Sequence, residues 1–184
     1  MAISYTNRKK DKFFAKMILS KKGTIRYYPV KDNPELNQNE IAEKLPDNFE
    51  FYEHPSDGQV VIRKKINFIF TIDDVEILEK TMKNVDDGHG FIVDRDKNGV
   101  IIYIGRMRFE DFPEFGENFF LAQSYNPKLR FEKADNKYKA QRFCFLSSHY
   151  GWLTMETNEN LQYLAKKYCP HINKLSLLDF WIEG

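Results

Sequence analysis

The chain has 184 residues, of which 42% are hydrophobic and 15% are aromatic, and its formal net charge is +1. This length suits one domain or two small ones, and the apolar content is enough for a sizeable core. The balanced charge excludes a general electrostatic attraction to nucleic acids or to membrane surfaces.

The sequence also argues against a membrane or secreted setting. No apolar run approaches the roughly 20 residues that span a bilayer. The first residues lead into charges rather than into the apolar stretch of a secretory signal. Two cysteines, Cys144 and Cys169, are too few for a disulfide scaffold. We therefore expect a cytoplasmic protein without a membrane partner.

The start of the chain is strongly basic. Residues 1–31 contain nine lysines and arginines but one acidic residue, Asp11. We expect residues 1–12 to be flexible. Basic residues could contact phosphates while a tyrosine stacks on bases. The residues suited to this role are Arg8, Lys9, Lys10, Lys12, Tyr27 and Tyr28. Because lysines also protect edge strands, and the rest of the chain is net acidic, a nucleic-acid partner is the less favoured interpretation.

Tight turns separate runs rich in β-branched and aromatic residues. Gly23, Gly58 and Gly99 each follow Lys, Asp or Asn, and we expect them to adopt the positive φ of a tight reversal. A fourth turn is expected near Asp135. The predicted hairpins pair residues 13–19 with 24–30, 49–54 with 59–66, 91–95 with 100–104, and 129–133 with 137–146.

Two segments show helical periodicity. In residues 72–83, Val75, Leu78 and Met82 fall on one face, and Thr71 stands at the N-cap position of a capping box. A second helix carries Leu161, Leu164, Ala165 and Tyr168 on one face, and Thr157 or Asn158 is expected to cap it.

These elements predict an α+β fold in which antiparallel hairpins form a sheet and two main helices pack on one face. No Gly-, Ser- or Pro-rich linker interrupts the chain, so we expect a single domain over residues 13–184. Residues 49–84 and 129–169 both run from hairpin to helix. This similarity raises a second interpretation, two ββ(β)α halves over residues 13–105 and 106–184 that share a core.

One segment resembles the start of a calcium-binding loop. Asp94, Asp96 and Asn98 have the spacing of the first three ligands. However, the twelfth position is Gly105 instead of a bidentate glutamate, and strand-forming residues follow the turn. A hairpin explains the segment without a metal ion, and we favour it.

Four side chains near the end of the chain are of the types that bind zinc. They are Cys144, His149, Cys169 and His171. Their spacing fits no usual zinc finger or ribbon, and a cysteine between two phenylalanines is more often a small buried hydrophobe. We therefore expect neither a metal site nor a cofactor.

A phenylalanine-rich segment follows the third hairpin. Phe109, Phe112, Phe115 and Phe119 recur among acidic residues and prolines. They could form a patch that binds a partner. We favour the other interpretation, in which the rings fill a gap between sheet and helices.

The chain contains no Walker loop, no G-x-G-x-x-G and no nucleophile elbow. The favoured hypothesis is a non-enzymatic protein–protein interaction or regulatory module, whose partner is another protein or a second copy of the chain. An enzyme is the main alternative, with a site assembled from scattered Asp94, Asp96, His89 and His149. Nucleic-acid binding through the basic segment and first hairpin is the other alternative.

Overall fold

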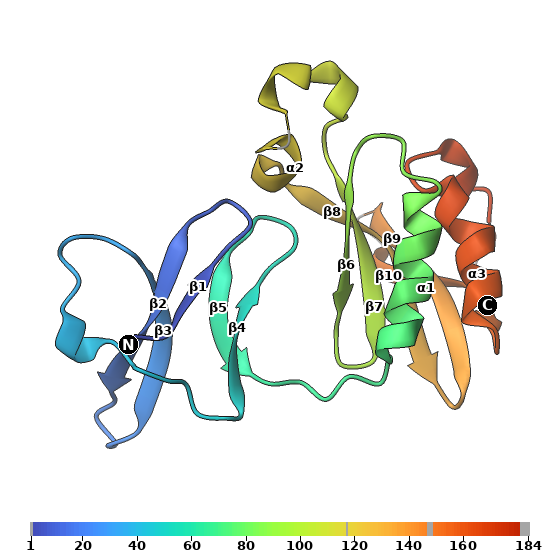
Figure 1. The fold of residues 1–184 in the computed structure, drawn as a ribbon. Helices are drawn as coiled ribbons and strands as arrows, with labels where there is room; N and C mark the ends of the chain where they lie inside the picture. Colours follow the sequence, from blue (N-terminus) through green and yellow to red (C-terminus); the bar gives the residue numbers. More distant parts are fainter. Residues whose placement is uncertain (1, 117, 147–148, 181–184) are drawn as a thin grey trace. The chain divides into compact units, whose positions relative to one another are not determined.

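The computed structural model describes residues 2–116, 118–146 and 149–180 of the chain (Figure 1). The chain divides into two compact units, Met1–Lys65 (unit 1) and Ile66–Gly184 (unit 2). Antiparallel sheets combine with helices, so the predicted α+β class is confirmed.

Unit 1 consists of hairpins. One sheet has the strand order β1-β2-β3, and the other contains β4 and β5. All neighbouring strands are antiparallel, and the predicted first and second hairpins are both present. The strands are β1 (Ser4–Thr6), β2 (Lys12–Leu19), β3 (Ile25–Lys31), β4 (Phe49–Glu53) and β5 (Val60–Lys64).

A small core joins these two sheets. Ala15, Ala42 and Leu45 are buried at its centre. Partly buried side chains from both sheets and from the first residues pack around them; these are Ile3, Met17, Tyr27, Phe49, Phe51 and Ile62. Met17 and Tyr27 face each other across β2 and β3, and they are the members of this core closest to the turn of that hairpin.

Unit 2 contains a five-stranded antiparallel sheet with the order β10-β9-β8-β7-β6. Consecutive strands are therefore neighbours throughout. The predicted third and fourth hairpins form two parts of this sheet. The strands are β6 (Phe91–Arg95), β7 (Gly99–Gly105), β8 (Tyr125–Ala134), β9 (Lys137–Leu146) and β10 (His149–Asn158).

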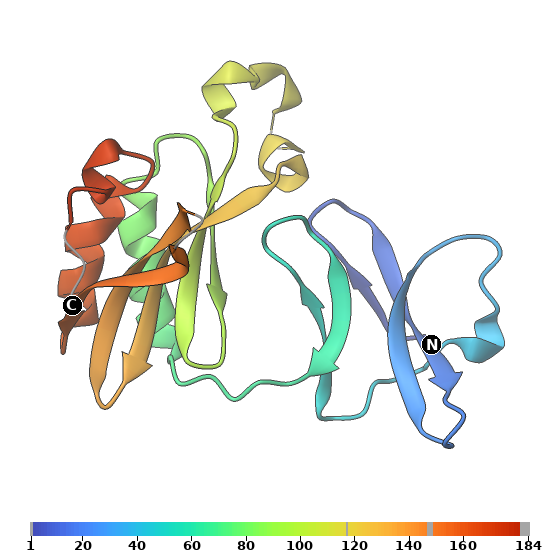
Figure 2. The same ribbon diagram turned by 180° about the vertical axis from the view of Figure 1, so that it is seen from behind.

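Helices α1 (Ile72–Lys83) and α3 (Leu161–Tyr168) lie side by side on one face of this sheet (Figure 1), and the strands lie in front of α1 in the opposite view (Figure 2). Their apolar sides share one core with the strands. The predicted capping box of α1 is present, since Thr71 Oγ1 accepts from Asp74 N at 3.2 Å and Asp74 Oδ2 accepts from Thr71 N at 3.0 Å.

A segment with three short helical elements connects β7 to β8. It contains 3-10 turns at Phe109–Asp111 and Pro113–Phe115, followed by helix α2 (Asn118–Ala122). In Figure 1 this segment is olive and yellow, and it projects beyond the ends of the strands of unit 2. None of the helices in the described ranges is long and apolar enough to cross a membrane.

The division of the chain differs from the expected single domain over residues 13–184. Each unit buries its own core, so the boundary falls after Lys65 without a flexible linker composition to mark it. The similarity of two ββ(β)α halves is not confirmed. The hairpin of residues 49–64 belongs to unit 1, whereas α1 belongs to unit 2, and β7 and β8 pair across the expected boundary at residue 105.

Two local details also differ from the sequence predictions. Residues 1–12 do not form a separate flexible segment, because β1 pairs with β2 through Tyr5 opposite Phe13. The N-cap of α3 is Asn160, whose Oδ1 accepts from Tyr163 N at 2.9 Å, instead of Thr157 or Asn158. Strand β10 continues to Asn158 and therefore occupies the two predicted capping positions.

Gly99 departs from the expected backbone conformation, although the hairpin is correct. Gly23 and Gly58 have positive φ as predicted, whereas Gly99 does not. The need for glycine at position 99 is steric. A Cβ atom there would lie 2.7 Å from the carbonyl oxygen of Phe131 on the neighbouring strand.

Replacing Gly99 with alanine is expected to destabilise unit 2 by about 1–3 kcal/mol, because β7 and β8 must separate to admit the new methyl group. Chemical denaturation measures the loss. Lys97→Ala in the exposed turn of the same hairpin is the control and is expected to change stability by less than about 0.5 kcal/mol. Equal stability of Gly99→Ala and the wild type would contradict the steric explanation.

Leu78 tests the packing of α1. Its side chain is 0% exposed in the core of unit 2, so Leu78→Ala is expected to cost about 2–5 kcal/mol in thermal or chemical unfolding. Ile72 begins the same helix but is 67% exposed, so Ile72→Ala is the matched control and should cost far less. Similar losses for the two variants would show that the helix faces are assigned incorrectly.

Candidate functional site

The turn between β2 and β3 is an ordered, exposed structure. Ser20 N donates to Thr24 O at 2.9 Å, Gly23 N donates to Ser20 O at 2.9 Å, and Thr24 N donates to Ser20 Oγ at 3.0 Å. Gly23 supplies the positive φ of this reversal. In both ribbon views the turn lies at the lower end of the blue unit (Figures 1 and 2). We call residues 18–28 the hairpin tip.

Large apolar side chains are exposed on the hairpin tip. Leu19 is 69% exposed and Ile25 is 51% exposed, and these two residues pair directly across the strands. Ile18 and Tyr28 are also exposed. Because successive residues of a strand point to opposite faces, Leu19 and Ile25 belong to one face of the hairpin, and Ile18 and Tyr28 belong to the other. Both faces of the tip therefore carry exposed apolar side chains, and Arg26 shares the second face because it pairs with Ile18.

The charges around these side chains are mostly basic. Lys21, Lys22 and Arg26 are exposed on the tip. At its base, Lys16 Nζ lies 2.7 Å from Glu40 Oε2, and the hydrogen bond and charge of Lys16 lower the pKa of Glu40. The hairpin tip therefore combines an apolar surface with positive charge.

A depression of about 310 Å³ lies beside the hairpin tip. It is lined by Lys16, Met17, Ile18, Leu19 and Glu40. Its walls offer methyl and methylene groups and one ion pair, that of Lys16 with Glu40. This arrangement can contact an apolar surface that carries a few charges.

The residues predicted to contact nucleic acid are not brought together. Arg8 pairs with Glu53 at 3.1 Å, and both side chains are only 12% exposed. Lys12 Nζ lies 4.8 Å from the centre of the Phe14 ring. Tyr27 packs against Phe49 in the core, whereas Tyr28 belongs to the opposite face of the hairpin. Lys9 and Lys10 are exposed.

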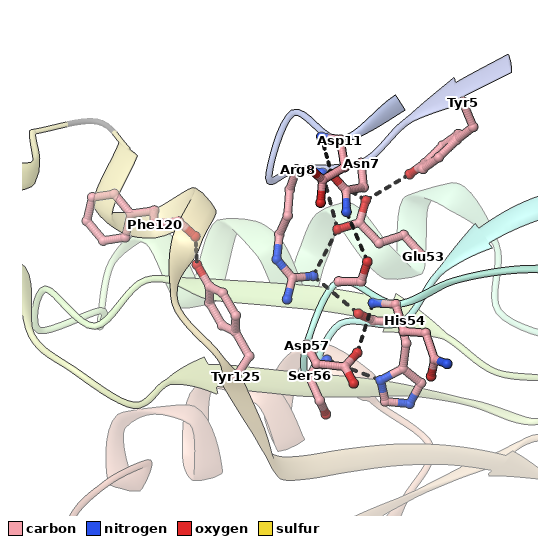
Figure 3. A network of polar contacts seen from close by, with 12 residues as sticks. Tyr5, Asn7, Arg8, Asp11, Glu53, His54, Ser56, Asp57, Phe120 and Tyr125 are labelled. Atoms are coloured by element: carbon pink, nitrogen blue, oxygen red, sulfur yellow. Dashed lines mark hydrogen bonds and ion pairs between the residues drawn. The ribbon is translucent and has the colours of Figure 1, made fainter. Parts of the chain in front are cut away.

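Arg8 instead takes part in a polar network that holds the first residues onto β4 (Figure 3). Arg8 N and Tyr5 Oη both donate to Glu53 Oε2 at 3.0 Å, and an Arg8 side-chain nitrogen donates to His54 O at 3.2 Å. Buried Asn7 donates to Gly58 O at 3.2 Å. Burial and the hydrogen bond to Glu53 raise the pKa of Tyr5 to about 12. The network therefore has a clear structural role.

The segment of the predicted calcium loop forms the β6–β7 hairpin. Asp94 belongs to β6, and Asp96 precedes the turn. Asp96 Oδ1 accepts from Asn98 N at 2.9 Å, and its other oxygen lies 3.1 Å from a nitrogen of Arg130. These two contacts engage both oxygens of the Asp96 carboxylate.

Three of the four predicted zinc ligands have described side chains, those of Cys144, Cys169 and His171. Cys144 is buried in β9, and Cys169 is buried after α3, where burial raises the pKa of its thiol to about 12. His171 Nδ1 lies 2.8 Å from Ser176 Oγ. The side chain of His149 lies outside the described part of the structure. Within that part, no three His, Cys, Asp or Glu side chains are grouped so that they could hold a metal ion.

Of the residues of the enzyme hypothesis, three have described side chains, and they lie along and beside β6. His89 precedes β6 and Asp96 follows it, so they lie at opposite ends of that strand. His89 Nδ1 lies 2.6 Å from Asp87 Oδ1. Burial opposes the ionisation of Asp87, but the hydrogen bond and charge of His89 outweigh it and lower the pKa of Asp87. Within the described part of the chain, no third His, Cys, Asp or Glu side chain joins this pair to form a group that could hold a metal ion.

The predicted partner-binding phenylalanines have mixed positions. Phe119 is buried, and Phe109 and Phe112 pack against its ring at centroid distances of 5.7 Å and 6.2 Å. Phe115 is 53% exposed. Phe109, Phe112 and Phe119 therefore pack on one another within the projecting segment instead of filling a gap between sheet and helices, and Phe115 remains on its surface.

Sequence reasoning placed Ile18, Leu19 and Ile25 in strands but did not identify them as exposed. The relevant signal was the presence of apolar residues at consecutive positions beside a Lys-Lys-Gly turn. A strand with one covered face alternates apolar and polar residues, whereas this strand end does not.

Comparison of the chain with known protein families, curated proteins and solved structures gives no match.

Glu53 is expected to be essential for the polar network of unit 1. Glu53→Gln leaves the Arg8 guanidinium buried without its carboxylate, so we expect a loss of about 3 kcal/mol. Amide hydrogen exchange over residues 1–65 measures the loss. Glu40→Gln removes an exposed pair with Lys16 and should have little effect. Unchanged exchange in Glu53→Gln would refute this role.

Proposed function

We propose that the protein is a non-enzymatic protein–protein interaction module, and that the hairpin tip is its docking element. The exposed apolar side chains on both faces of one ordered hairpin are the observation that carries this proposal. Burying one such side chain in a partner gains about 1.5–3 kcal/mol. Contiguous apolar surface of this kind commonly marks interaction sites.

The arrangement of the side chains favours a groove over a flat partner surface. Leu19 and Ile25 point to one face and Ile18 and Tyr28 to the other, so only a groove can cover both sets at once. Lys21 and Lys22 in the turn would then meet the end of the groove, and Arg26, which pairs with Ile18, would lie along one of its walls. The partner that fits has an apolar groove with acidic residues at its edge, because opposite charges speed and orient docking.

The order of residues along the tip argues against insertion into lipid. Lys21 and Lys22 occupy the turn, so they would enter the hydrocarbon ahead of the apolar side chains. Placing a lysine at the centre of a bilayer costs about 2.5–3.5 kcal/mol. In a protein groove the same two lysines can reach carboxylates or water beyond its end.

We further propose that the protein works in the reducing environment of the cytoplasm. Cys144 and Cys169 are both free thiols in the structure.

A regulatory role would follow from competition for the hairpin tip, since a partner that covers the tip excludes every other partner.

The test replaces the two most exposed apolar residues, as Leu19→Ser with Ile25→Ser, here called the tip variant. Both side chains lie outside the core of unit 1, so the fold should persist. Immobilised wild type is expected to enrich a defined set of proteins from a cell extract, and the tip variant is expected to lose that set. Quantitative mass spectrometry measures the enrichment.

Tyr163→Ser is the control, because Tyr163 is an exposed aromatic residue on α3 of unit 2. This control should retain the enriched set. The proposal fails if the tip variant retains the same proteins as the wild type while circular dichroism shows that both are folded. It also fails if the control loses them equally.

A further inference from the structure

The segment between β7 and β8 carries a second exposed surface, which we call the acidic lobe (residues 106–116). Phe115 and Met107 are exposed on it. The run Phe109–Phe115 contains Glu110, Asp111 and Glu114 but no lysine or arginine. All three acidic side chains are exposed. The acidic lobe therefore pairs apolar surface with negative charge.

The acidic lobe is supported by a packed interior. The rings of Phe119 and Phe120 meet at a centroid distance of 5.1 Å, and Phe109 stacks on Phe120 at 5.7 Å. Below them, Tyr125 Oη donates to Phe120 O at 2.6 Å, as the dashed line in Figure 3 marks. A rigid support lowers the entropy lost when a surface binds a partner.

Hydrogen bonds also attach the acidic lobe to the sheet. Buried Gln123 donates to His89 O at 2.7 Å and accepts from Met107 N at 3.3 Å. Phe109 N donates to Gly88 O at 2.8 Å. The exposed side chains are therefore displayed on a fixed base that extends from β6 to β8.

The acidic lobe complements the hairpin tip in charge and in apolar character. The tip carries Lys21, Lys22 and Arg26 beside Leu19 and Ile25. The lobe carries its carboxylates beside Phe115 and Met107. The lobe also contains two arginines: Arg108 pairs with Glu110 at 2.8 Å, and Arg106 Nε donates to Asn126 Oδ1 at 3.3 Å on β8. Its negative charge toward a partner therefore comes mainly from Asp111 and Glu114.

We propose that the acidic lobe of one copy of the chain binds the hairpin tip of a second copy. This inference rests on the proposed function, since it names a partner for the same hairpin. The contact joins two different surfaces and is therefore heterologous, so its repetition builds either a closed ring or an open chain of subunits. The exposed side chains are few, and the contact belongs with small, transient interfaces below about 1,200 Å².

Sedimentation of the wild-type protein provides the first test. The weight-average mass is expected to rise with concentration between about 10 µM and about 1 mM, the range of weak contacts of this size. High salt should reduce the association, because it screens exposed charges. The tip variant, Leu19→Ser with Ile25→Ser, should remain monomeric, and so should a lobe variant, Glu114→Lys with Phe115→Ser.

Mixing the two variants provides the decisive test. The tip variant keeps an intact acidic lobe, and the lobe variant keeps an intact hairpin tip. One productive contact can therefore form in the mixture, so a one-to-one heterodimer is expected without longer species. Tyr163→Ser, which changes neither surface, should assemble like the wild type.

A monomeric wild type across this concentration range overturns the inference. A wild type that assembles, combined with a monomeric mixture of the two variants, also overturns it, since another surface must then be responsible. Either result leaves the proposed function intact if the tip variant still loses the proteins that the wild type enriches. If the tip variant loses nothing in that assay, the proposed function itself fails.

Discussion

The hydrophobic core of unit 1 does not extend along the full length of the β2–β3 hairpin. Met17 and Tyr27 are the last pair of β2 and β3 that packs against the opposing sheet. The next pair on the same face, Leu19 and Ile25, is largely exposed in the described part of unit 1. A domain of about 60 residues buries a smaller share of its surface than a larger domain does, so few of its residues are available to cover such a pair. The exposed hairpin tip, and with it the proposed docking, follows from this mismatch.

Unit 1 compensates for its small core with a buried polar network. Glu53 accepts hydrogen bonds from Tyr5 and Arg8, and Asn7 reaches the turn that follows β4. Arg8 belongs to the most basic stretch of the sequence, but its charge is paired with Glu53 within unit 1. Local charge counts describe the attraction of a segment to phosphates only when its cations remain at the surface.

The sequence predicted the elements that depend on local signals. Thr71 and Asp74 marked the start of α1, and the glycine turns located the hairpins, because capping and turn formation involve residues close in sequence. The division after Lys65 was missed because it depends on which hairpins share a core. The turn at Gly99 was predicted correctly, but the reason for glycine there was not. Glycine is required because the backbone of Phe131, on another strand, lies too close for a side chain, and sequence near position 99 does not reveal that neighbour. The exposure of Leu19 likewise depends on the absence of a covering element in the described unit, which no local pattern encodes.

A weak head-to-tail contact would give this small protein a property that neither surface has alone. Each copy presents one hairpin tip and one acidic lobe, so it can bind a second copy through either surface, and the extent of association depends on concentration. An outside partner with an acidic apolar groove would compete for the same Leu19 and Ile25. Binding of that partner would then end a chain of copies, because the occupied tip cannot enter another lobe. Self-association and partner binding would oppose each other through a single hairpin, and this competition is a physical basis for a regulatory module that performs no chemistry.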